Sequence, residues 1–147
     1  MLLHKNHKLI YKNVAAIEIP NNVYLDPCPD PCPVEGLVLY SEDMCTRADI
    51  NFITTEKDAR SFLEEGSEVY ESFQSIKPLS SVSTNGVEGF SMTYATSRYI
   101  YEEYVFTIPG DDPTLLNICI EQRKERPADS AQYAQLVEEL LAGIKII

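Results

Sequence analysis

The residues with the most evident chemical potential lie in the stretch DPCPDPCP, residues 26–33, where prolines flank two cysteines. Two thiols this close in sequence can form a disulfide, a redox pair or part of a metal site. Alternating prolines favour polyproline II, which rises about 3.1 Å per residue and sets Cys28 and Cys32 roughly 12 Å apart at Cα. A disulfide tolerates at most about 7 Å, so only a turn at Asp30-Pro31 or a cis proline would join them. We therefore expect a stiff surface connector with free thiols, and the alternative is a thiol or metal site organised by Cys28 and Cys32.

The other reactive side chains lack the neighbours that catalysis needs. The two histidines, His4 and His7, stand in a polar N-terminal segment, which leaves none inside the fold for Ser/His/Asp chemistry. Cys45 and Cys119 stand singly, so the four cysteines do not have the paired spacing of a zinc site. Phosphate-loop, dinucleotide, zinc-protease and EF-hand motifs are absent from the sequence. We expect no enzyme activity, no catalytic residue and no cofactor.

Two groups of residues favour recognition of a partner. Four glutamates crowd the polar side of a predicted helix at spacings of three and four: Glu64, Glu65, Glu68 and Glu71. Such like-charged pairs destabilise an isolated helix by roughly 0.2–0.5 kcal/mol each, so this side is either a solvated face or a surface for a basic partner. On a predicted strand, Tyr99 and Tyr101 lie opposite the face that holds Ile100 and Tyr104. Their apolar face is either covered by a helix or forms a groove for a peptide or small ligand.

Length and charge restrict the class of protein. A chain of 147 residues has the usual size of one domain, and no apolar run approaches the ~18–20 residues of a membrane span. Twelve Lys and Arg against 23 Asp and Glu give a net charge of −11, which repels nucleic acid. The N-terminus has no apolar region of the kind found in secretory signals. We expect one soluble, cytoplasmic domain over residues 1–147, with residues 1–7 as a mobile tail and another protein as its partner.

Alternation of apolar and polar residues predicts strands over much of the chain. Residues 8–20 contain one or two short strands, and residues 36–56 contain a strand pair in which Ala48, Ile50 and Phe52 share one face. Three longer strands fill residues 86–122 and predict an antiparallel meander. Asn85-Gly86 predicts a hairpin turn, because this dipeptide readily adopts positive φ.

A 3.6-residue period predicts a helix over residues 57–73. Its apolar stripe includes Leu63 and Phe73, which should both be buried against the sheet. Thr54 or Thr55 is the expected N-cap.

A second helix is predicted over residues 130–142, with Asp129 or Ser130 as its cap. Both helical stripes are buried only if the helices pack on a sheet. The predicted fold is therefore α+β, an antiparallel sheet flanked by two amphipathic helices in an α/β/α sandwich.

The order of these elements resembles the PsbP-like superfamily, which groups a photosystem extrinsic protein, a Ran-binding nuclear-transport factor and many bacterial relatives. The matching features are Gly86 and Gly89 between and within strands, Pro109-Gly110 ending a long strand, and a terminal helix that runs into LLAGIKI. The resemblance implies the same sandwich and a non-enzymatic protein-binding, adaptor or chaperone-like module. Because the superfamily shares no catalytic motif, it implies no catalytic residue here.

Overall fold

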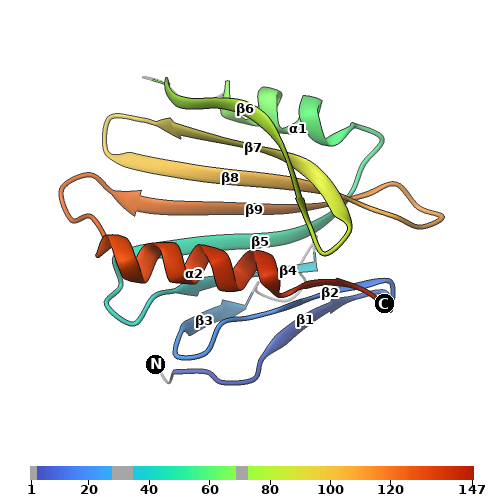
Figure 1. Cartoon of the computed structure of the whole chain (residues 1–147), viewed down its shortest axis with the longest axis horizontal. Helices are drawn as coiled ribbons and strands as arrows, with labels where there is room; N and C mark the ends of the chain where they lie inside the picture. The colour runs from blue at the N-terminus through green and yellow to red at the C-terminus, as the bar shows by residue number, and fades with distance from the viewer. Residues whose placement is uncertain (1–2, 28–34, 69–72) are drawn as a thin grey trace.

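Two antiparallel sheets account for the strands of this computed structural model, which describes residues 3–27, 35–68 and 73–147 (Figure 1). The larger sheet holds, in spatial order, β3 (Tyr24–Pro27), β4 (Glu35–Tyr40), β5 (Thr46–Thr54), β9 (Thr114–Arg123), β8 (Tyr99–Ile108), β7 (Val87–Ala95) and β6 (Gln74–Thr84). The smaller sheet holds β1 (Lys8–Tyr11), β2 (Ala15–Glu18) and β10 (Ile144–Ile146). The helices of the described residues are α1 (Ala59–Ser67) and α2 (Ser130–Ala142).

The helices pack on opposite faces of the larger sheet. In β5, Ala48, Ile50 and Phe52 are buried in one cluster with the apolar residues of α2 and the smaller sheet, and the alternation had predicted this shared face. Figure 1 shows α2 in front of this face. On the other face, Leu63 of α1 is buried with Tyr94. The predicted α+β sandwich, including the meander β7-β8-β9, is confirmed. Neither helix has the length and apolar content needed to cross a membrane.

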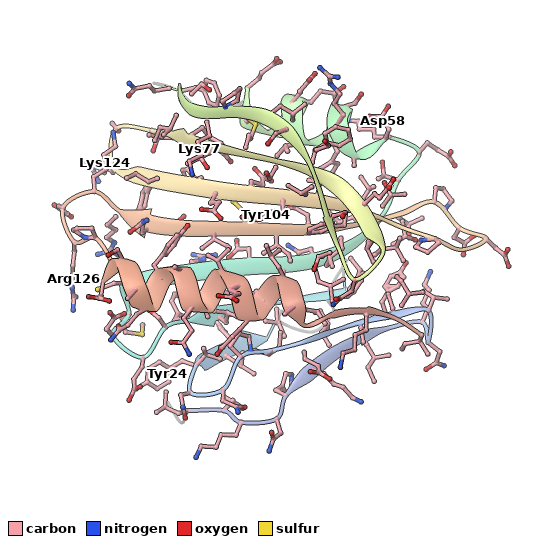
Figure 2. The ribbon with its side chains drawn as sticks, in the orientation of Figure 1. Tyr24, Asp58, Lys77, Tyr104, Lys124 and Arg126 are labelled. Carbon is pink, nitrogen blue, oxygen red and sulfur yellow. The ribbon has the colours of Figure 1, made fainter. Side chains whose placement is uncertain are left out.

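Helix α1 is shorter than predicted and has a different cap. Asp58, at its start in Figure 2, accepts a hydrogen bond from the Ser61 amide at 2.8 Å, so neither threonine of the predicted pair is the N-cap. The helix ends at Ser67. Phe73 is 38% exposed and lies directly before β6, so its predicted burial at the end of the helix is wrong. Its helical spacing is coincidental, because it belongs to the approach to a strand.

The part of β6 that precedes Pro78 was not predicted from the sequence, because its residues show no clear apolar alternation. It forms one edge of the larger sheet, and most of its side chains are exposed. Its pairing with β7 shifts register between Ser75 and Lys77 and again between Lys77 and Ser80. Pro78 lies within the second shift and removes one backbone donor. Bulges, a lysine and a proline together block the addition of another strand at this edge.

The turn between β6 and β7 holds the end of α2. Asn85-Gly86 forms the predicted hairpin turn, with φ of 51° and 78°. Thr84 Oγ1 donates to the Leu141 carbonyl at 2.9 Å, and Asn85 Nδ2 donates to the Ala142 carbonyl at 2.9 Å. The last carbonyls of a helix have no partner within the helix, so the hairpin supplies the missing donors.

The smaller sheet joins segments that are distant in sequence. Ile17 of β2 lies opposite Ile144 of β10, and both are fully buried. Residues 4–7, predicted to be part of a tail, hydrogen-bond to the segment before β3: the His4 amide donates to the Val23 carbonyl, and the Asn6 amide donates to a side chain of the same segment, both at 2.8 Å.

Candidate functional site

The sheet face that packs on α1 carries an unusual row of polar and aromatic side chains. Strand register places these residues side by side across five strands: Tyr40, Arg47, Glu121, Tyr101 and Tyr94. Arg123 and Tyr99 form the next pair along β9 and β8. We call these seven residues the tyrosine face. Because α1 packs mainly on β7 and β8, the part of the tyrosine face on β4, β5 and β9 lies beyond the helix.

A hollow of about 160 Å³ opens at this end of the tyrosine face. It is lined by Tyr40, Met44, Cys45, Arg47, Tyr99, Glu121, Gln122 and Arg123. The half-buried side chain of Tyr99, which the sequence pattern identified as a candidate binding residue, therefore borders a depression. Tyrosine and arginine side chains combine apolar area with hydrogen-bonding groups, which suits them to recognition.

Arg47 is held in place by two neighbours. Its Nε lies 2.8 Å from Asp49 Oδ1 and its Nη2 lies 3.3 Å from Oδ2, so the carboxylate fixes the plane of the guanidinium. Its Cζ stands 5.9 Å from the centre of the Tyr40 ring, within range of a cation–π contact. Nη1 makes no hydrogen bond to any described residue.

Further charges lie near the hollow, where β9 runs into α2. Figure 2 shows Lys124 and Arg126 on the same side of the molecule. The Lys124 amide donates to the Arg98 carbonyl at 2.9 Å, so the backbone of a third basic residue lies beside that of Lys124. Glu121 lies close to Arg47 and Arg123, and Arg126 Nη2 donates to the Asp43 carbonyl at 3.4 Å. The field at the hollow is therefore mixed in sign, which suits a protein surface better than a simple anion.

Tyr101, the second predicted binding tyrosine, lies beneath this surface. Only 7% of it is exposed, and its ring stacks on Tyr94 with centroids 5.1 Å apart. Tyr101 thus supports the tyrosine face from below, while Tyr99 borders the hollow.

A buried carboxyl group lies beside the stacked rings. Glu103 accepts hydrogen bonds from the Tyr94 hydroxyl at 2.7 Å and from Asn117 Nδ2 at 2.9 Å. Burial raises the pKa of Glu103, and these two hydrogen bonds only partly oppose it. Burial also raises the pKa of the neighbouring Cys119 thiol, with the charge of Glu103 adding to the effect. A thiol that keeps its proton at neutral pH is a poor nucleophile and a poor metal ligand.

The raised pKa of Glu103 predicts a specific pH dependence of stability. The folded state binds this proton more tightly than the unfolded state, whose pKa is near 4.5. The stabilisation is therefore complete below that pH and is lost as pH rises through the folded-state pKa. Between pH 4.5 and 8, the melting temperature of the wild type should fall relative to that of Glu103→Gln. Glu121, whose pKa is also raised, is common to both proteins and cancels in the difference. If the melting temperatures of the wild type and Glu103→Gln change in parallel with pH across this range, the raised pKa of Glu103 is contradicted.

The acidic side of α1 has mixed charge. Glu64 lies 2.9 Å from Arg60 Nε, and Glu65 lies 2.5 Å from Lys57 Nζ. Glu68 is the C-cap residue, and Glu71 lies outside the described residues. A surface for a basic partner on these glutamates remains a prediction, and internal ion pairs already occupy two of its carboxylates.

The thiol or metal alternative also remains a prediction, because Cys28 and Cys32 lie outside the described residues. Cys45 and Cys119 are free and half-buried. Within residues 3–27, 35–68 and 73–147, no three His, Cys, Asp or Glu side chains are grouped so that they could hold a metal ion.

Comparison with known proteins finds likeness in structure only. No family model matches the chain, and no curated protein is significantly similar to it in sequence. LpqN of Mycobacterium tuberculosis, which is involved in cell envelope biogenesis, has 13% identity and a TM-score of 0.65, over 90% of this chain and 82% of LpqN. A protein of Bacteroides thetaiotaomicron has 12% identity and a TM-score of 0.55, over 95% of this chain and 48% of its own length. These likenesses establish a shared fold.

Sequence analysis missed Arg47, Tyr40 and Glu103 as parts of the site. The local signal for Arg47 was present, because it alternates with the buried residue Ala48 on β5. The order of strands was not readable, since β5 lies beside β9 and not beside the next strand in sequence. A row across a sheet is a non-local feature, and alternation within one strand does not reveal it.

Proposed function

We propose that this chain is a non-enzymatic protein-binding module of the PsbP-like kind, an adaptor or chaperone-like protein that binds its partner through the tyrosine face. The observation that carries the proposal is the hollow at Tyr99 with Arg47 held at its edge. Binding energy in protein interfaces concentrates in a few residues, most often Trp, Tyr and Arg. A pre-positioned arginine loses little side-chain entropy on binding, so more of its interaction energy contributes to affinity.

The chemistry around the hollow favours recognition over reaction. Glu103 is occupied by its two donors, and the pKa of Cys119 is raised, so neither group is poised as a base or nucleophile. LpqN, which shares the fold, is involved in cell envelope biogenesis, and this role is compatible with a binding module. The fold likeness names no partner for this chain, so the partner must be sought by experiment.

The proposal predicts that Tyr99→Ala and Arg47→Ala each weaken partner binding by about tenfold or more, because each removes a residue of the type that dominates interfaces. Partners captured by affinity purification with the wild-type chain should be depleted with either variant. The dissociation constant of each identified partner is then measured by calorimetry. Ile10→Ala serves as a control, because Ile10 is an exposed apolar residue of β1, in the smaller sheet and away from the tyrosine face.

A variant of α1 tests the competing surface. Glu64, Glu65 and Glu68 are changed together to Gln, which removes the charge of the described part of the acidic side. If this variant loses the partner while Tyr99→Ala binds normally, the tyrosine face is the wrong surface. Melting curves of every variant establish that a loss of binding does not reflect unfolding.

A further inference from the structure

A second surface, on the opposite face of the sheet from the tyrosine face, has different chemistry. Two adjoining hollows of about 250 and about 770 Å³ follow α2 and share Pro20, Asn21, Asn22, Gln135 and Glu139 in their walls. One wall is the polar side of α2, and the other is formed by residues 20–23, the turn between β4 and β5, and the segment before β1. We call this surface the α2 groove.

Helical spacing directs one stripe of α2 into the groove. Gln132, Gln135 and Glu139 lie three and four positions apart, so they share one side of the helix. The smaller hollow begins beside Gln132, and the larger one reaches Gly143. At 1.5 Å per residue these positions span roughly 16 Å, which suits an extended ligand of several linked units better than a single small molecule.

Side-chain amides are the commonest polar groups in the α2 groove. Five line it: Asn6, Asn21, Asn22, Gln132 and Gln135. Each amide offers two donors and one acceptor, so a wall of amides can satisfy a ligand that both donates and accepts. The side chains of Asn22 and Gln132 make no hydrogen bond to any described residue.

Carboxylates add acceptors beside these amides. Glu42, Asp43 and Glu139 line the smaller hollow, and its lining includes no Lys or Arg, although Arg126 contacts the Asp43 carbonyl from outside. Gln135 Nε2 donates to Glu139 Oε1 at 3.1 Å, which orients both side chains along the groove. This excess of carboxylates among the lining residues disfavours phosphate and carboxylate ligands. His7 and Lys8 line the far end of the larger hollow, so a polycation is not favoured along the whole length.

The floor of the smaller hollow is apolar. Val23 is 3% exposed and Leu136 is 8% exposed, and the half-buried ring of Tyr133 lies next to them. The Tyr133 hydroxyl donates to Glu102 Oε1 at 3.2 Å, which holds the ring in place. A ligand that fits must therefore present C–H surface to the floor and hydroxyl groups to the walls.

We propose that the α2 groove binds a neutral oligosaccharide. Sugar hydroxyls donate to the carboxylates and accept from the amides, and the C–H faces of sugar rings pack on the apolar floor. The turn between β4 and β5 borders both this groove and the hollow of the tyrosine face, but the two surfaces lie on opposite faces of the larger sheet. The chain would therefore hold a glycan on one side of its sheet and a protein on the other.

The test uses the whole chain and neutral gluco-, galacto- and manno-oligosaccharides, from tetra- to hexasaccharides, first on an array and then by calorimetry. At least one class should bind with a dissociation constant of about 1 mM or tighter, unchanged by added salt because no net charge is paired. The double variant Gln132→Ala with Glu139→Ala should weaken binding by about tenfold or more. Glu138→Ala is the matched control, since Glu138 is exposed on α2 and does not line the groove.

Three results would overturn the proposal: saturation by none of these oligosaccharides, equal binding by the groove double variant, or binding of poly-lysine alone with strong salt dependence. Tyr99→Ala should leave glycan binding unchanged, so failure of the groove and failure of the tyrosine face are separately detectable. The melting temperature of the double variant should match that of the wild type, because both substituted side chains are exposed. This measurement establishes that the variant is folded.

Discussion

Leu63→Ala is expected to lower the free energy of unfolding by about 2–5 kcal/mol, since it removes buried methyl groups and leaves a cavity. Leu63 is fully buried on α1, in a cluster with Tyr94, Val105 and Leu115 of the larger sheet. This is the main apolar anchor of α1, which is only nine residues long and has little stability of its own. Urea denaturation followed by circular dichroism measures the change.

Ile76→Ala provides the comparison for Leu63→Ala. Ile76 lies on β6 and is 50% exposed, so its truncation should change stability by no more than about 0.5 kcal/mol. Both substitutions remove a branched aliphatic side chain, and the two replaced residues differ in how deeply they are buried. An unchanged urea midpoint for Leu63→Ala would mean that α1 does not pack on the sheet as described.

Gly143→Ala should destabilise the fold by about 1–3 kcal/mol, because an added methyl group overpacks the contact between α2 and β2. A Cβ at Gly143 would lie 2.4 Å from the Glu18 carbonyl oxygen and 3.2 Å from the Glu18 amide nitrogen. These are backbone atoms, which cannot rotate away as a side chain would. The Glu18 amide also donates to the Gly143 carbonyl at 2.8 Å, so moving the strand aside would lengthen this bond.

The same substitution at Gly66 should have the opposite effect on stability. A Cβ at Gly66 meets nothing within 4 Å, and the residue lies within α1. Gly66→Ala should therefore stabilise the protein by about 0.5–1 kcal/mol, because alanine has the higher helix propensity and a smaller backbone entropy loss. Thermal melts of Gly143→Ala and Gly66→Ala measure the direction of each change in stability. A loss of stability in Gly66→Ala would contradict the open space around Gly66.

Sequence patterns predicted the elements whose burial is regular. The alternation of Ala48, Ile50 and Phe52 identified β5, and Asp129 was one of the two residues expected to cap α2, where its carboxylate accepts from the Gln132 amide at 3.0 Å. The part of β6 before Pro78 shows no such alternation, because an exposed and bulged edge does not require apolar residues at alternate positions. The end of α1 was misplaced because Phe73 follows the helical spacing by chance.

The candidate site was predicted only in part, because its neighbours come from different strands. Tyr99 was identified from one strand alone, whereas its relation to Arg47 depends on β9 lying between β8 and β5. The glutamates of α1 illustrate the same limit. Their spacing suggested a purely acidic surface, but the ion pair between Glu65 and Lys57 requires the chain before the helix to fold back beside it.

Strand β10 pairs with β2 across a long stretch of chain, as the 127-residue separation between Lys145 and Glu18 shows. At about 5–20 residues per second, the ribosome makes β2 roughly 6–25 s before β10. During that time Ile17 has no strand on its β10 side, and the nascent chain presents an open, apolar edge. Such edges pair readily with other chains. The order of synthesis therefore leaves exposed in the nascent chain an edge that the finished sheet conceals.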